Sequence, residues 1–173
     1  MTTLTDLMPV EDWKKLEQEI HDMSGLDVNI FNPEGVRISD FKAWINRLCP
    51  EIKATDKGQS FICAVAHMNV AEQARQKGTA VIEECDAGLL KLVVPIFYND
   101  QFLGAAGACG ALLDDGEVDT FLIEKIAEIE ESITGPLTTD IKQVSHAQAQ
   151  RVVEFIQEHI NRIVADYDSK LSA

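Results

Sequence analysis

Two adjoining apolar segments, Leu89–Tyr98 and Gln101–Cys109, constrain the fold of this chain more than any other feature. The first is apolar with a single lysine, and the pair Asn99-Asp100 that follows it is typical of a tight turn. The sequence therefore predicts a β-hairpin at the centre of a sheet. The second segment is made mostly of small residues, and small residues let a helix, another backbone or a small ligand approach a strand closely. Those residues are Gly104, Ala105, Ala106, Gly107, Ala108 and Gly110.

Pro95 is the discordant residue of the first strand, because proline cannot donate a hydrogen bond to a neighbouring strand. It predicts either a free strand edge or a β-bulge beside a pocket. Ahead of this strand stands Cys85-Asp86-Ala87-Gly88, which places a thiol and a glycine turn at the entrance to the predicted hairpin.

The rest of the chain alternates between helical and extended patterns. Together they predict an α+β fold: a central antiparallel sheet of about five strands, of the PAS or GAF kind, with flanking helices and a long C-terminal helix. The expected helices are Pro9–Ser24, Phe41–Leu48 (ending before Pro50), Gly58–Lys77 and Val118–Ile133, and the other expected strands are Leu26–Phe31, Val36–Ile38 and Thr79–Glu84.

From Ser145 onward, apolar residues recur at alternating steps of three and four, which is close to a heptad pattern. The pattern predicts a long helix that packs either on its own domain or against a second copy in a homodimer. The apolar residues are Ala149, Val152, Ile156, Ile160, Ile163, Tyr167 and Leu171.

The charge balance excludes some partners. Fifteen basic and twenty-nine acidic residues give a formal net charge of −14, so nucleic acids and anionic membranes should be repelled. No membrane-spanning segment or secretory leader is apparent, and four scattered cysteines do not suggest a secreted disulfide scaffold. We therefore expect a cytoplasmic protein that binds neither membrane nor nucleic acid directly and whose cysteines are reduced thiols or ligands.

The cysteines are the main candidates for chemistry. Cys49, Cys63 and Cys85 lie in separate predicted elements with no C-x-x-C pair. If the fold brings them together, they could hold a metal ion, an iron–sulfur cluster or haem, or form a redox-switched disulfide. Otherwise each is a small buried hydrophobic residue, as we expect for Cys109.

Enzymatic activity is not expected, because the chain has no nucleophile elbow, Walker loop or dinucleotide-binding motif. Cys63 and His67, four residues apart, form the only helical Cys/His pair, which is weak evidence for catalysis. The aromatic residues Phe61 and Phe97 either line an apolar ligand site or fill the core.

Several short segments, taken in order, resemble the PocR-type sensory domain, a ligand-binding module related to GAF and PAS domains. They are Cys49-Pro50, Gly58 with Cys63, Cys85-Asp86-Ala87-Gly88-Leu89, Val94-Pro95-Ile96 and Phe102-Leu103-Gly104. Members of this family look like sensors of small organic molecules, fused to transcription-factor or histidine-kinase output domains. Asp86 stands where the family often has histidine, so a ligand that needs that imidazole is not expected.

The resemblance covers roughly Leu16 to Gly110, with the flanking helices adding to it. Together with the heptad-like pattern, it leads us to expect a sensory domain over residues 1–137 and a dimerisation or signalling helix over 138–173. We expect a small-molecule ligand between the hairpin and the helices, lined or gated by Cys49, Cys63, His67 and Cys85, with Phe61 and Phe97 as further contacts. The alternatives are a redox, metal or haem sensor that uses Cys49, Cys63 and Cys85, and a dimeric interaction protein without a ligand.

Overall fold

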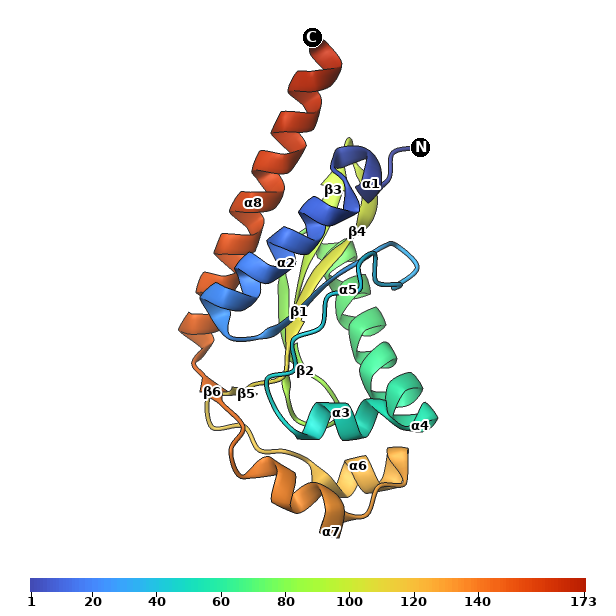
Figure 1. The fold of residues 1–173 in the computed structure, drawn as a ribbon, viewed down its shortest axis with the longest axis vertical. Coiled ribbons are helices and arrows are strands. Elements are labelled where there is room, and N and C mark those ends of the chain that lie inside the picture. The colour runs from blue at the N-terminus through green and yellow to red at the C-terminus, as the bar shows by residue number, and fades with distance from the viewer.

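The computed structural model describes all 173 residues and has a four-stranded antiparallel sheet at its centre (Figure 1). The strand order is β1-β4-β3-β2. The strands are β1 (Asp27–Phe31), β2 (Val81–Glu84), β3 (Leu90–Tyr98) and β4 (Gln101–Cys109). The predicted α+β class is confirmed, with one strand fewer than expected in this sheet. The missing strand is Val36–Ile38, which contributes only an isolated bridge between Arg37 and Phe31.

The central hairpin forms as predicted. Asn99 and Asp100 both have positive φ angles, 46° and 62°, which match the twist of the two strands that they join. Pro95 lies beyond the end of β2, whose pairing with β3 extends only from Leu90 to Val93. The edge alternative for Pro95 is therefore correct, and a register shift follows one residue later, between Ile96 and Phe97.

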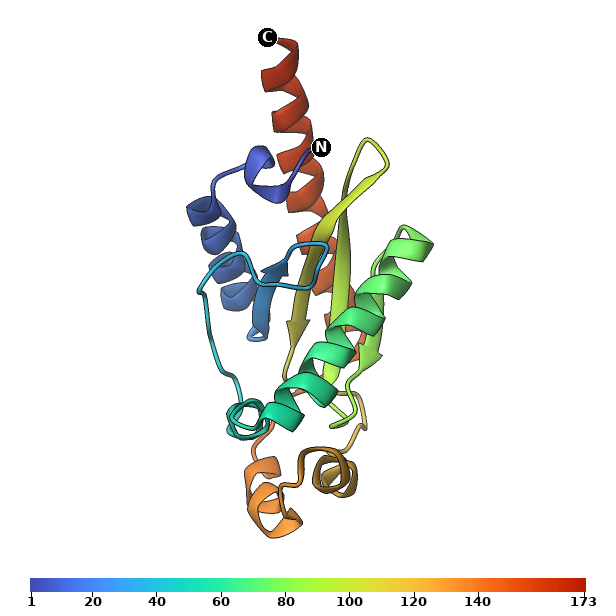
Figure 2. The same ribbon diagram turned by 90° about the vertical axis from the view of Figure 1, so that its right-hand side faces the viewer.

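Helices cover both faces of the sheet (Figure 2). On one face lie α1 (Leu4–Leu7), α2 (Val10–Ser24) and α8 (His146–Ser172), and on the other lies α5 (Val65–Lys77). Because side chains alternate along a strand, β3 serves both layers. Its residues Leu90, Leu92, Val94 and Ile96 share the main core with α2 and α8, whereas Val93 packs against α5.

The segment before α5 differs from its prediction. The expected helix Phe41–Leu48 is wrong: α3 spans Leu48–Lys53 and contains Pro50 in its first turn. A proline is tolerated there, since the first N–H groups of a helix have no partner within it. Cys49 thus begins a helix instead of ending one.

The predicted helix Gly58–Lys77 contains a wider turn. After the short α4 (Asp56–Gly58), residues Gln59–Ala64 form a π-helix that continues into α5. Such a turn inserts extra backbone and changes which side chains face inward. Phe61, expected inside, is 56% exposed.

The predicted helix Val118–Ile133 is also divided. It consists of α6 (Thr120–Ala127) and α7 (Glu131–Thr134), separated by Glu128 in the left-handed conformation with φ of 59°. A 3₁₀ turn (Gly135–Thr138) follows α7. A small parallel pair, β5 (Leu112–Leu113) and β6 (Gln143–Val144), joins this part of the chain to the main body.

The last helix, α8, starts at a capping box in which the Ser145 hydroxyl accepts from the Gln148 N–H. Ala149, Val152, Ile156 and Ile160 are buried in the main core of the same chain. The first half of the heptad-like pattern is therefore used within the domain. Ile163 and Tyr167 pack at the margin of this core, and only the last turns extend past the sheet (Figure 1), where Leu171 is 63% exposed.

Candidate functional site

One face of the sheet forms the floor of a cavity of about 410 Å³, a volume within the range of small-molecule sites. Strand register determines which residues meet there. Cys109 of β4 pairs with Asp27 of β1 on one side and with Lys91 of β3 on the other, so these three form one row across the floor. In the next row lies Gly107, beside Asn29.

Gly107 is what leaves the floor open. A Cβ atom at this position would lie 3.1 Å from Lys91 Nζ, 3.3 Å from Phe31 Cε2 and 3.6 Å from His67 Nδ1. The small-residue strand thus has two uses: Ala106 and Ala108 pack in the main core, and Gly107 keeps space for the cavity.

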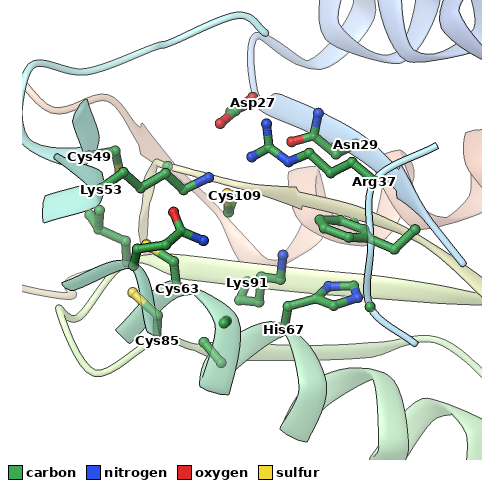
Figure 3. Close-up of a pocket in the computed structure, with 18 of the residues that line it drawn as sticks. Asp27, Asn29, Arg37, Cys49, Lys53, Cys63, His67, Cys85, Lys91 and Cys109 are labelled. Atoms are coloured by element: carbon green, nitrogen blue, oxygen red, sulfur yellow. The ribbon is translucent and has the colours of Figure 1, made fainter. Parts of the chain in front are cut away.

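The opposite wall comes from helices of the segment that joins β1 to β2. Cys49 and Lys53 of α3, Cys63 of the π-helix and His67 of α5 all line the cavity. A loop carrying Arg37 closes another side. In Figure 3, Asp27, Asn29 and Arg37 gather on one side, the labelled cysteines lie mostly on the other, and Lys91 lies between them beside His67.

The α3 wall is attached to the sheet by Asn46. Its amide nitrogen donates hydrogen bonds to the Gly110 carbonyl, at 2.7 Å, and to Cys49 Sγ, at 3.2 Å. Its side-chain oxygen accepts a hydrogen bond of 2.7 Å from the Cys49 N–H. Cys49 is therefore held at a fixed place beside the end of β4.

All four cysteines line this one cavity, including Cys109, which we expected to serve only in packing. All are free thiols. Burial raises the pKa of the Cys49 and Cys85 thiols and raises that of Cys63 to about 11. At neutral pH these three thiols are therefore protonated, whereas metal binding and disulfide exchange use the thiolate.

The predicted metal site has no geometric support. No group of three or more His, Cys, Asp or Glu side chains is placed to hold a metal ion. Cys49, Cys63 and Cys85 share a cavity without sharing a coordination point, so a metal or haem at these residues stays a prediction.

Besides the cysteines, the cavity contains a buried histidine, His67. It is only 4% exposed and its ring stacks on Phe31, with centroids 3.6 Å apart. Burial, reinforced by the charges of Lys91, Arg37 and Lys53, lowers its pKa to about 3, so the ring is neutral at physiological pH. Its Nδ1 atom is buried and has no hydrogen-bond partner.

The two aromatic contacts predicted from the sequence lie elsewhere. Phe61 points outward from the π-helix, and Phe97 packs edge-to-face on Phe102, with ring centroids 5.5 Å apart, near the turn of the hairpin. Neither lines the cavity. The aromatic side chains that do line it are Phe31 and Trp44.

Sequence reasoning also missed the charged lining, which is Arg37, Lys53, Lys91 and Asp27. Only Lys91 had a visible signal, as the single charge within an apolar strand. Arg37 and Lys53 lie in segments whose charges look like ordinary surface charges, and only tertiary structure turns them toward the cavity.

The structure is thus an antiparallel sheet with helices on both faces and a cavity of small-molecule size between the sheet and the helices α3 and α5. The family model described as the sensory domain found in PocR matches residues 6–167, nearly the whole chain. The chain therefore belongs to the PocR sensory-domain family and is a sensory domain. No curated protein and no solved structure matched it. Among its helices, none combines the length and the apolar character that crossing a bilayer needs.

Proposed function

We propose that this domain binds a small organic molecule in the cavity between the sheet and the helices α3 and α5, and that its terminal helices transmit occupancy. The observation that carries the proposal is a cavity of about 410 Å³ lined by functional groups without protein partners, among them His67 Nδ1 and the Lys91 ammonium. Buried polar groups in folded proteins are nearly always paired, so a ligand that supplies the missing partners would be favoured.

A route from the cavity to the terminal helix follows from the alternation of β3. Lys91 faces the cavity, and its neighbours Leu90 and Leu92 lie in the core that includes Ile156 and Ile160 of α8. A ligand that shifts β3 by a small amount therefore acts on the helix packed behind it. Transmission requires that the ligand bind the two arrangements of α8 with different affinities.

The output end of this route is the projecting part of α8. Beyond Ile160 the apolar spacing continues through Ile163 and Tyr167, which pack at the margin of the core, to Leu171, which is exposed. This supports pairing with a second copy through residues 138–173 in a cytoplasmic homodimer, which would pass the signal to a kinase or transcription-factor partner.

The ligand-binding part is tested with a cavity-filling variant, Gly107→Leu, and a matched control, Ala165→Leu, on the exposed surface of α8. Thermal unfolding would be followed with a panel of short alcohols, diols and carboxylates. We expect at least one class to raise the Tm of the wild type and of Ala165→Leu, but not that of Gly107→Leu. Equal responses of both variants would contradict binding in this cavity.

The dimer is tested by sedimentation velocity. Leu171→Glu should shift the wild-type dimer toward monomer, whereas Ser172→Glu adds the same charge at an exposed polar position and should not. A monomeric wild-type protein at micromolar concentration would exclude α8 pairing as the means of output.

A further inference from the structure

The charge inside the cavity is opposite to that of the whole protein. The chain has a formal net charge of −14, yet the cavity lining carries three cationic side chains, Arg37, Lys53 and Lys91, and one carboxylate, Asp27. Among the other titratable groups of the lining, His67 and the thiols of Cys49, Cys63 and Cys85 are neutral at pH 7 because burial opposes their charged forms. The cavity is thus an electropositive region in an acidic protein.

These cations form no ion pair and no side-chain hydrogen bond within the protein, although the charges of all three act to lower the pKa of Asp27, which burial raises. The ion pairs and side-chain hydrogen bonds of the structure engage other basic residues, and none involves Arg37, Lys53 or Lys91. Asp27 lies in the same row as Lys91 but forms no ion pair with any of the three. Two of them lie over aromatic rings: Lys91 Nζ is 5.3 Å from the Phe31 centroid, and Lys53 Nζ is 5.2 Å from that of Trp44.

Lys91 is the most telling of the three, since it is 7% exposed and sits in the middle of the sheet. Its Nζ borders the open space above Gly107 and has no carboxylate within ion-pair distance. An anion in that space would accept a charge-assisted hydrogen bond from this ammonium.

His67 is a second, independent indication of a ligand in this space, because its buried Nδ1 atom has no hydrogen-bond partner. The Cβ position of Gly107 lies 3.1 Å from Lys91 Nζ and 3.6 Å from His67 Nδ1, so both nitrogens border the space above this glycine. An anionic oxygen there would accept from the Lys91 ammonium and from the Nδ1–H tautomer of the imidazole. The guanidinium of Arg37, which stands 6.0 Å from the Phe31 centroid, lines the same cavity and supplies further donors.

The other side of the cavity is of a different character. It is lined by protonated thiols and by Leu89 and Ala64, which favour an apolar body. We propose that the ligand of this sensory domain is a small organic carboxylate, whose carboxylate group lies among Lys91, Arg37, Lys53 and His67 and whose hydrocarbon part lies against the cysteines. This inference rests on the proposed function and names the chemical class of its ligand.

The test compares matched pairs of probes, butanoate with butan-1-ol and hexanoate with hexan-1-ol, by titration calorimetry and thermal unfolding. We expect the carboxylates to bind and raise Tm and the alcohols of equal length to bind at least tenfold more weakly, since each hydrogen bond to a charged group contributes about a factor of ten or more. Inorganic phosphate is the third probe and tests whether any anion is enough. We expect it to bind more weakly than hexanoate, because it has no hydrocarbon part to contact the cysteines.

The variants are Lys91→Met and Lys53→Met, with Lys77→Met as the control for the loss of one positive charge at an exposed position on α5. Lys91→Met should weaken butanoate and hexanoate binding by about tenfold to a hundredfold. Lys53→Met should also weaken binding of both carboxylates, and Lys77→Met should not.

The outcomes separate this inference from the proposed function. If the alcohols bind as well as the carboxylates and Gly107→Leu blocks them, the ligand is neutral: the anion inference is overturned and the sensor proposal stands. If Lys91→Met and Lys77→Met bind carboxylates equally, the cavity cations do not contact the ligand and the inference is wrong. Phosphate binding as tight as that of hexanoate would also overturn it, and binding by no probe of any class would count against both.

Discussion

The hydroxyl of Tyr98 donates a 2.7 Å hydrogen bond to Asp168 Oδ1, which ties the end of β3 to the projecting part of α8. The Tyr98 ring also meets Tyr167 edge-to-face, with ring centroids 5.1 Å apart. Since β3 carries Lys91 in the cavity and Tyr98 at its other end, one strand touches both the candidate ligand site and the candidate output helix.

Removing this hydrogen bond should loosen the output helix with little effect on the domain. Tyr98→Phe keeps the ring contact with Tyr167, so we expect a loss of global stability of about 1 kcal/mol or less. Hydrogen–deuterium exchange should become faster in the last turns of α8 and stay unchanged in β3 and β4. Unchanged exchange in α8 would mean that apolar packing alone holds the helix.

Glu17 fastens the loop that leads to Arg37 and is buried in α2. Its carboxylate accepts from the Ile30 N–H at 2.7 Å and from the Ser39 hydroxyl. Burial outweighs these hydrogen bonds and raises the pKa of Glu17, so the wild-type protein loses stability as pH rises from the ordinary glutamate pKa through the raised one.

Substitution of Glu17 should therefore depend on what replaces it. Glu17→Gln keeps polar partners for Ile30 and Ser39, and its stability should improve relative to the wild type as pH rises through this window. Glu17→Leu leaves the buried Ile30 N–H and the partly buried Ser39 hydroxyl unpaired and should cost about 2 kcal/mol or more at every pH. Urea unfolding across pH measures both, and a wild type more stable than Glu17→Gln by a growing margin at rising pH would contradict the raised pKa.

His67 should make the domain sensitive to acid. Its pKa in the folded protein is about 3, against 6.5 for an ordinary histidine, so below about pH 6.5 the unfolded chain takes up a proton that the folded chain does not. Stability should fall as pH is lowered from 6.5 toward 3, and His67→Gln should lose less between about pH 7 and pH 5. His146→Gln, at an exposed histidine, controls for the substitution itself, and parallel pH profiles for the wild type and His67→Gln would refute this assignment.

Two glycines of β4 should respond very differently to alanine. Gly104 has a φ of 141°, and a Cβ there would collide with the Phe31 carbonyl oxygen of the neighbouring strand. Gly107 has an ordinary φ and would place its Cβ 3.1 Å from the end of the flexible Lys91 side chain. We expect Gly104→Ala to destabilise the protein by about 3 kcal/mol or more and Gly107→Ala by about 1 kcal/mol, measured by chemical denaturation. Similar losses at both positions would show that the cavity floor is not open.

The cysteines should react slowly. At pH 7 a thiol of pKa about 11 contains about a hundredfold less thiolate than one at the ordinary value of 9.0, so alkylation of Cys63 by iodoacetamide should be slower than that of a peptide cysteine by a similar factor. Peptide mapping by mass spectrometry gives the rate at each cysteine, and urea-unfolded protein provides the reference. Fast alkylation of native Cys63 would support the redox or metal alternative.

Local patterns in the sequence were enough for the main secondary structure. The apolar β3 segment, the Asn99-Asp100 turn, the amphipathic α2 and the spaced apolar residues of α8 each depend on neighbours in the chain, and these elements form where predicted. The patterns failed where one residue changes the geometry: Pro50 falls in a first turn, and the π-turn before α5 exposes Phe61. Neither outcome can be derived from spacing alone, because both depend on what the segment packs against.

The cavity required tertiary structure, since its lining comes from segments distant in sequence. The sequence marked Cys49, Cys63, Cys85 and His67 as candidates and determined the small residues of β4 that leave space beside them. Strand register, a long-range property, placed Asp27 and Lys91 on either side of Cys109. The spacing of charged residues along the sequence does not predict which of them will face a cavity. For that physical reason, only the packing of the helices against the sheet determined that the cavity of this acidic chain is lined by cations.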